Sequence, residues 1–126
     1  MAAIERRGLL VLACVLPAFA LACGGVPVVI GKDGPDFDAC LGVGVIVRET
    51  ELYPTPQDRP EFQQSLAPGT QVFVCDGSED GAWSGVVLPD GDESCGVTSP
   101  VESPRPYGGP CRSGWVKSLD IEVVAG

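Results

Sequence analysis

The sequence predicts an all-β domain of about five short strands. Three observations lead to this fold class. Runs of four to seven residues rich in Val, Ile and aromatic side chains recur along the second two-thirds of the chain. Segments rich in Gly, Pro, Ser and acidic residues separate these runs, as turns and loops do. No amphipathic helix of convincing length and no internal repeat interrupts the pattern.

Each expected strand has its own pattern. The first is a nearly continuous β-branched run, which is typical of a buried strand, and the second alternates so that Val72 and Val74 point inward against Gln71 and Phe73. The third opens on a tryptophan, and the last two are short. The five expected strands are residues 43–48 (VGVIVR), 70–75 (TQVFVC), 82–88 (AWSGVVL), 113–118 (SGWVKS) and 121–124 (IEVV).

Three irregular segments connect these strands. Residues 49–62 carry three prolines and therefore predict a long loop. Residues 76–81, DGSEDG, predict a tight acidic turn whose glycines can take positive φ. Residues 89–111 form a long excursion of Pro, Gly, Ser and acidic residues before the penultimate strand.

The amino-terminal segment has the pattern of an export signal. Arg6 and Arg7 precede 15 uncharged residues, from Gly8 to Ala22. A membrane-spanning helix needs about 20 apolar residues, whereas the core of a signal peptide needs about 7–15. We therefore expect residues 1–22 to be a signal peptide, residues 23–42 to be a tether or N-terminal arm rich in Gly, Pro and Asp, and residues 43–126 to be the folded domain.

The signal ends at Cys23, and two kinds of processing fit. Ala20-Leu21-Ala22 suits ordinary signal peptidase, which would release a soluble secreted protein. The same residues followed by Cys23 resemble the lipobox of bacterial lipoproteins, although Ala20 stands where that family favours leucine. Of the 6 cysteines, Cys14 leaves with the signal, so lipid on Cys23 leaves an even set of four in an oxidising compartment. We therefore expect lipid attachment at Cys23, and Gly24 after it implies, by the family's rule, sorting to the outer membrane.

The net charge of the mature chain limits the classes of molecule that it can bind. Loss of residues 1–22 removes Arg6, Arg7 and Glu5, which leaves 6 basic and 16 acidic residues and a net charge of −10. Nucleic acid is excluded as a partner, because binding its backbone requires a basic face. Anionic wall polymers and anionic lipid headgroups are poor partners for the same reason.

The order of motifs resembles a bacterial Src-homology-3-like domain. That family's first strand and proline-containing loop correspond to VRETELYPTP, and its second strand corresponds to SLAPGTQVFV. Its third strand, which opens on a tryptophan, corresponds to GAWSGVVL. Its Gly-Trp-Val strand, with a short turn and the last strand, corresponds to SGWVKSLDIE. The resemblance covers residues 43–124 and implies a small barrel that holds ligands in grooves between loops. The sequence departs from the family at the long insertion 89–112 and at Glu49-Thr50-Glu51.

The resemblance also suggests which residues form the core, the disulfides and the ligand surface. A barrel this small has a thin core that disulfides would reinforce, and four cysteines allow three pairings. We expect Cys95–Cys111, which would close the insertion, and Cys40–Cys75, which would tie the arm to the barrel. The expected core residues are Val45, Val47, Leu52, Val72, Val74, Trp83, Val86 and Val116. The candidates for a peptide-contact surface are Tyr53, Phe62, Tyr107 and Trp115.

Catalysis and metal binding are not expected. The chain has 0 histidines, which removes the usual general base and the Ser-His and Cys-His nucleophile arrangements. The cysteine spacing does not match a structural zinc site. Two acidic clusters, at Asp33–Asp38 and Asp90–Glu93, do not follow the calcium-loop pattern, and the second reads as a solvated turn. We expect no cofactor.

The sequence thus predicts a non-enzymatic interaction module of the cell envelope or periplasm, anchored by lipid and binding protein or peptide ligands. Two alternatives stay open: recognition of the peptidoglycan stem peptide, and a small secreted inhibitor or immunity-type protein whose acidic face steers it onto a basic enzyme.

Overall fold

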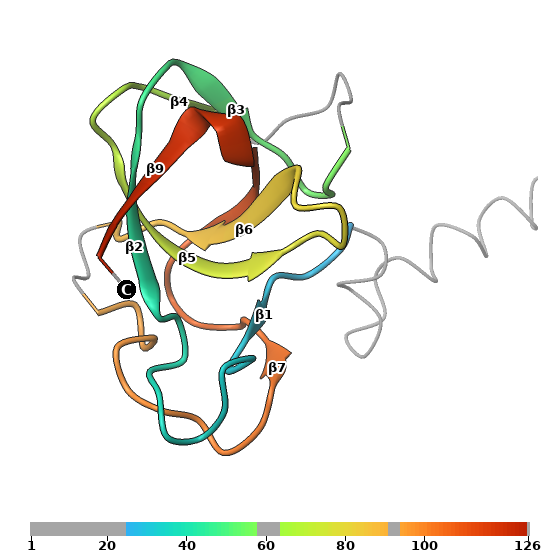
Figure 1. The fold of residues 1–126 in the computed structure, drawn as a ribbon, viewed down its shortest axis with the longest axis vertical. Coiled ribbons are helices and arrows are strands. Elements are labelled where there is room, and N and C mark those ends of the chain that lie inside the picture. Colours follow the sequence, from blue (N-terminus) through green and yellow to red (C-terminus); the bar gives the residue numbers. More distant parts are fainter. Residues whose placement is uncertain (1–24, 58–63, 91–93, 126) are drawn as a thin grey trace, which may run out of the picture.

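The fold was analysed in a computed structural model, which describes residues 25–57, 64–90 and 94–125. The predicted all-β class is confirmed: within these ranges the regular elements are nine strands and one 3-10 turn (Figure 1). The expected signal peptide, the lipid site at Cys23 and the candidate ligand residue Phe62 lie outside the described residues.

An antiparallel sheet of five strands in the order β8-β6-β5-β2-β9 organises the domain. These strands overlap the five runs expected from the sequence. Their bounds are β2 Gly42–Ile46, β5 Gln71–Gly77, β6 Trp83–Val87, β8 Ser113–Lys117 and β9 Ile121–Ala125. The 3-10 turn η2, Ser118–Asp120, connects β8 to β9. The sheet is open and ends at β8 and β9, so its closure into a barrel stays a prediction.

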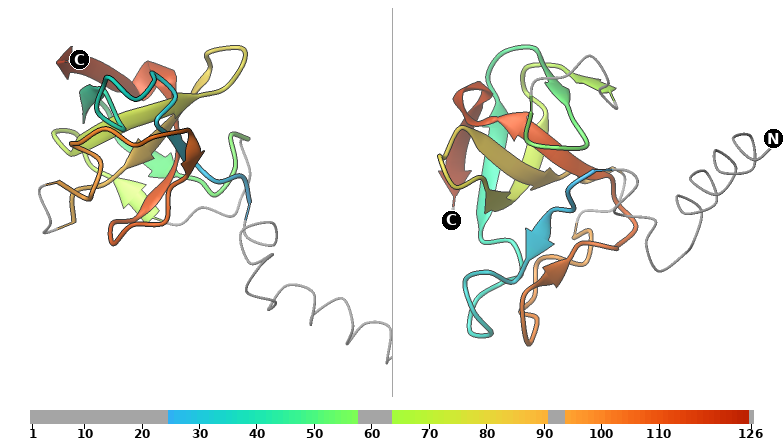
Figure 2. Two further views of the ribbon diagram at one scale, coloured as in Figure 1. Left: turned by 90° about the horizontal axis from the view of Figure 1, so that it is seen from below. Right: turned by 90° about the vertical axis from the view of Figure 1, so that its right-hand side faces the viewer.

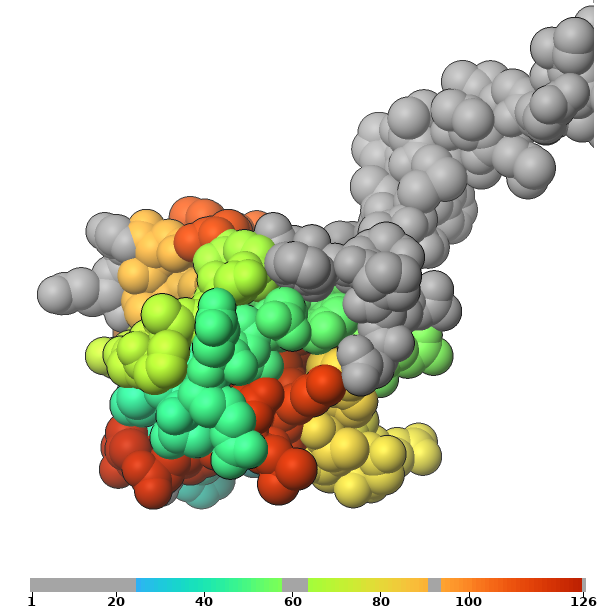
Figure 3. All heavy atoms as spheres, turned by 90° about the horizontal axis from the view of Figure 1, so that it is seen from above, coloured from blue at the N-terminus to red at the C-terminus, as the bar shows by residue number. Residues whose placement is uncertain are grey.

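Two small sheets arise from segments that the sequence presents as loops. β3 (Thr50–Leu52) pairs with β4 (Gln64–Leu66), and β1 (Val29–Ile30) pairs with β7 (Arg105–Pro106). These strands have two or three residues each, which is too short for a period-2 pattern to emerge among the flanking prolines. In Figures 1 and 3 the β3–β4 hairpin and the η2–β9 segment lie side by side at the top of the molecule.

Both faces of the main sheet are buried. On one face, the β3–β4 hairpin covers a cluster that we call the hairpin-side core: Ile46, Leu52, Leu66, Val72, Val86, Leu88 and Val116. On the other face, the N-terminal arm and the insertion cover the arm-side core: Val28, Ile30, Ala39, Cys40, Phe73, Cys75, Val87, Cys95, Val97, Tyr107, Cys111 and Trp115. The sheet is therefore the middle layer of the domain.

Of the two interpretations of residues 23–42, a tether and an N-terminal arm, the described part, residues 25–42, fits the arm, and this arm is packed on the sheet. Val28 and Ile30 are 2% and 3% exposed in the arm-side core. The backbone of the arm is also paired: the Tyr107 N–H donates to the Val28 carbonyl at 2.8 Å, and the Cys40 N–H donates to the Val97 carbonyl at 3.1 Å. The arm folds because the second apolar face of the sheet requires a cover, which a solvated tether cannot supply.

The two disulfides have the pairing expected from the sequence. Cys40–Cys75 joins the end of the arm to β5, and Cys95–Cys111 closes the insertion. Tyr107 lies inside the closed insertion, where its hydroxyl donates to the Cys95 carbonyl at 2.8 Å and accepts from the Cys111 N–H at 3.1 Å. The insertion is thus a compact, internally bonded cover for the sheet.

The expected core is partly corrected. Val72, Val86, Val116 and Leu52 are fully buried. In contrast, Val47 is 45% exposed and Val45 is only half-buried, and the buried residues of β2 are Gly44 and Ile46. The inward positions of β2 are Gly42, Gly44 and Ile46. A Cβ on Gly44 would lie 2.7 Å from Ile121 Cγ2, so side chains of neighbouring strands fill the place that a valine would take. Because glycines occupy these positions, the pattern of apolar residues in the sequence does not show which face of β2 points inward.

Truncation of Ile30 tests whether the arm belongs to the core. We expect Ile30→Ala to lower the free energy of unfolding by about 2–5 kcal/mol, because it leaves a cavity under the sheet. Phe37→Ala, at an exposed position of the same arm, should change it by less than about 0.5 kcal/mol. Urea unfolding with intact disulfides measures both, and equal small effects would show that the arm is not packed.

Substitution of Gly44 tests the register of β2. We expect Gly44→Ala to destabilise the domain by about 1–3 kcal/mol, because the new methyl group overpacks the contact with Ile121. Gly108→Ala is the matched control, since a Cβ there meets no atom within 4 Å. A thermal or urea unfolding midpoint that is the same for both variants would contradict the inward position of Gly44.

Candidate functional site

Three of the four aromatic residues expected on a ligand surface are buried, and that expectation is corrected for them. Tyr53, Tyr107 and Trp115 are 5%, 7% and 3% exposed. Each has an internal role: Tyr107 bonds the insertion, the Trp115 indole N–H donates to the Val26 carbonyl at 2.8 Å, and the backbones of Tyr53 and Trp115 bond to each other at 2.8 Å in both directions. These rings therefore support the fold rather than contact a ligand.

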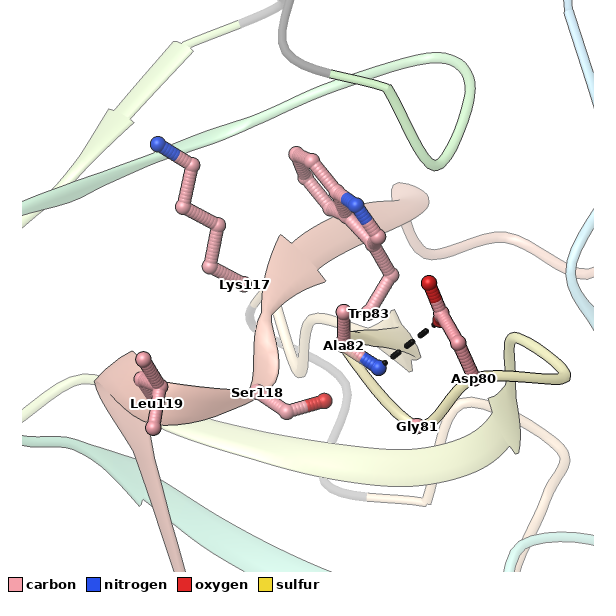
Figure 4. A pocket seen from close by; sticks show the side chains of 7 residues that line it. All are labelled: Asp80, Gly81, Ala82, Trp83, Lys117, Ser118 and Leu119. Atoms are coloured by element: carbon pink, nitrogen blue, oxygen red, sulfur yellow. Dashed lines mark hydrogen bonds between the residues drawn. The ribbon is translucent and has the colours of Figure 1, made fainter.

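A groove of about 450 Å³ lies between two turns at the end of the main sheet (Figure 4). One side comes from the β5–β6 turn and the start of β6, and the other from the end of β8 and η2. The lining residues are Asp80, Gly81, Ala82, Trp83, Lys117, Ser118 and Leu119.

Strand pairing brings the two sides of the groove together. Trp83 is opposite Lys117 in the β6–β8 register, so the residues that precede β6 and follow β8 emerge at the same end of the sheet. The Ser118 N–H donates to the Ala82 carbonyl at 2.9 Å, and the hydroxyls of Ser84 and Ser118 share a hydrogen bond of 2.8 Å. These bonds fix the width of the groove before any ligand enters.

The groove combines a supported aromatic ring with an exposed apolar side chain. Trp83 is half-buried, and its ring packs edge-on against Tyr53 with the ring centroids 5.5 Å apart and an interplanar angle of 84°. Leu119 is 81% exposed. Leu119 and Trp83 line the groove from opposite sides, and such apolar groups gain free energy when a ligand covers them.

Asp80 places a fixed negative charge at the rim. Its carboxylate accepts from the Ser78 hydroxyl at 2.7 Å and from the Ala82 N–H at 3.0 Å. The Ser78 bond, followed by the Ala82 bond, lowers the pKa of the Asp80 carboxyl below its ordinary value. Asp80 is therefore ionised at neutral pH, and its orientation is set by the turn that carries it.

This groove was not identified from the sequence, although two signals pointed to it. The acidic turn DGSEDG runs directly into Trp83, and Lys117-Ser118-Leu119 directly precede the last strand. The first segment was predicted as a turn, whereas Lys117 and Ser118 were assigned to the end of the expected strand 113–118. What the sequence did not supply was the β6–β8 register, which brings these turns to the same end of the sheet.

A second groove has a different character. Gln64, Thr70, Gln71 and Pro89 contribute to its lining, together with Asp90 and Arg112. The Arg112 Nε donates to Asp90 Oδ2 at 2.7 Å, with a further bond from Nη2 to Oδ1. This pair lowers the pKa of the Asp90 carboxyl and raises that of Arg112. Asp90 is thus held by Arg112.

No group of three or more His, Cys, Asp or Glu side chains in residues 25–57, 64–90 and 94–125 is arranged to hold a metal ion. No helix in the same ranges is both long and apolar enough to span a bilayer. Comparison of the chain with protein-family models, curated proteins and solved structures found no match.

A pH titration tests the geometry of Asp80. The Ala82 amide proton, which bonds the carboxylate, should shift with a midpoint below pH 3.8, the ordinary value for aspartate. Because the folded-state pKa is lowered, the stabilisation of the turn is present at neutral pH and is lost as the pH falls through that midpoint. Asp80→Asn should abolish the transition in a proton–nitrogen correlation spectrum. A midpoint at or above 3.8 would contradict the bonded carboxylate.

Proposed function

We propose that this protein is a non-enzymatic interaction module of the cell envelope, which binds an extended segment of a protein or peptide in the groove between the β5–β6 turn and η2. The observation that carries the proposal is a groove lined by the exposed Leu119 and by the supported ring of Trp83, with the fixed Asp80 carboxylate at the rim. A groove that combines these apolar side chains with the polar groups of Asp80, Lys117 and Ser118 is suited to a peptide ligand, whose side chains and backbone supply both kinds of contact.

The arrangement of motifs supports the Src-homology-3-like part of the proposal. The runs expected as that family's strands lie together in one antiparallel sheet. The short turn expected before the last strand is the 3-10 turn η2. Trp83, the tryptophan that opens the third expected strand, lies in the groove, as a family that holds ligands between loops would require.

The charge of the surface favours a partner that is not anionic. The described ranges hold five basic residues, and three of them, Lys32, Arg48 and Arg112, form ion pairs with Asp76, Asp120 and Asp90. The remaining acidic residues leave a negative surface. Like-charge repulsion therefore disfavours anionic wall polymers, whereas a basic or neutral peptide is attracted or tolerated.

Substitution of Leu119 tests the groove. Covering a leucine is worth about 1.5–3 kcal/mol, and each 1.4 kcal/mol is tenfold in affinity, so Leu119→Lys should weaken binding by at least about tenfold. The mature protein without lipid would be immobilised and exposed separately to isolated peptidoglycan and to envelope proteins. The affinity of each identified ligand would then be measured by calorimetry.

Phe37→Lys is the matched control, because it makes the same kind of change at an exposed position outside the groove. Full retention by Phe37→Lys with loss by Leu119→Lys supports the groove. Salt-insensitive binding to purified peptidoglycan would identify the stem peptide as ligand. A basic protein that is released by salt and binds Leu119→Lys normally would instead favour the inhibitor alternative and overturn the groove as the binding site.

A further inference from the structure

We propose that the domain rests directly on the lipid bilayer, with the surface around Val26, Pro54 and Pro56 against it and the end of β9 facing away. This inference rests on the cell-envelope location in the proposed function and on the lipid anchor expected at Cys23. It goes further by naming the face of the domain that contacts lipid.

The first step is that the chain is fixed almost from the anchor onward. The Val26 N–H donates to the Pro54 carbonyl at 3.0 Å, and the Val26 carbonyl accepts from the Trp115 indole at 2.8 Å. The backbone of Gly25 is also close-packed: a Cβ there would lie 2.4 Å from the Pro54 carbonyl oxygen. The domain therefore begins by residue 25, with no slack between that point and the arm-side core.

The second step is covalent geometry. Only Gly24 separates Cys23 from Gly25. Two Cα–Cα steps span at most about 7 Å, whereas a flexible linker of many residues would be needed to let the domain turn freely above a membrane. A lipid on Cys23 thus holds the surface around Gly25 next to the headgroups.

The third step is the character of that surface. The two segments that meet at the anchor point are residues 25–31 and 52–57, and neither contains a charged residue. Val26 is 47% exposed, and Pro54 and Pro56 are partly exposed. In a mature chain of net charge −10, a surface formed by uncharged segments can approach anionic headgroups with less repulsion than the acidic remainder of the surface.

The fourth step is the position of the opposite side of the domain. Both panels of Figure 2 place the beginning of the described chain on one side of the domain, and the β5–β6 turn and the end of β9 on the other. The end of β9 is therefore farther from the lipid than Val26 is. Trp83 of the groove lies closer to the lipid, because its ring packs against Tyr53, which directly precedes Pro54.

Paramagnetic lipids test this orientation. The acylated protein, purified from its native membrane and checked by intact mass, would be placed in nanodiscs of phosphatidylethanolamine and phosphatidylglycerol that contain a gadolinium-chelating headgroup. The nuclear magnetic resonance signals of valine methyl groups report the distance to gadolinium, and valines are present on both the membrane-facing side and the opposite side of the domain. We expect the Val26 signal to lose intensity several-fold relative to gadolinium-free discs, whereas the Val123 and Val124 signals keep most of theirs.

Two controls make the result specific. Insertion of a long Gly-Ser linker between Gly24 and Gly25 should make the losses at Val26 and Val124 similar, because the domain can then turn. Pro56→Asp should reduce the difference between the losses at Val26 and Val124, because it places a negative charge against the anionic headgroups. It should leave the domain folded, because Pro56 is in a partly exposed loop. Equal losses in the protein without the linker, or a mature protein without acyl chains, would overturn the proposal. Neither outcome affects the groove, whose ligand is measured on the protein without lipid.

Discussion

The apolar character of β5 on both of its faces is the constraint on which the rest of the structure depends. Val72 lies in the hairpin-side core, while Phe73 and Cys75 lie in the arm-side core. A strand with two apolar faces cannot face water on either side, so the sheet needs two covers. The β3–β4 hairpin supplies one, and the N-terminal arm with the insertion supplies the other. The two disulfides secure the second cover, which has the least regular secondary structure.

Two adjacent residues of β5 hold the arm in place by different means. Cys75 binds it covalently through Cys40. The neighbouring Asp76, whose side chain is largely buried, accepts from the Val29 N–H at 2.9 Å and from Lys32 Nζ at 2.5 Å. A buried carboxylate is stable only when its charge and its hydrogen bonds are both satisfied, and the arm satisfies both. An arm that detached would leave an apolar sheet face and an unpaired charge together, so its attachment is strongly favoured.

The strands were predictable from the sequence where the pattern extends over five or more residues, as in β5 and β6. The two disulfide pairs were also expected, because the insertion and the arm each needed one attachment. Which residues of β2 point inward could not be predicted, because Gly42 and Gly44 occupy inward positions and have no apolar side chain to mark them. The packing of the arm was missed because Gly, Pro and Asp dominate its composition, and the buried Val28, Ile30 and Ala39 are too few to form a period. The groove depends on the β6–β8 register, which is a tertiary property.

Two of the aromatic residues expected to contact a ligand, Tyr53 and Trp115, instead connect the segment around Val26 to the groove. The Trp115 indole bonds the Val26 carbonyl beside the start of the domain, and its backbone pairs with Tyr53. The Tyr53 ring in turn packs against Trp83 in the groove. This series of direct contacts crosses the close-packed domain, in which side chains have few alternative positions. The segment around Val26 and the groove are therefore parts of one rigid unit, and whatever fixes the orientation of the first also fixes the direction in which the second faces.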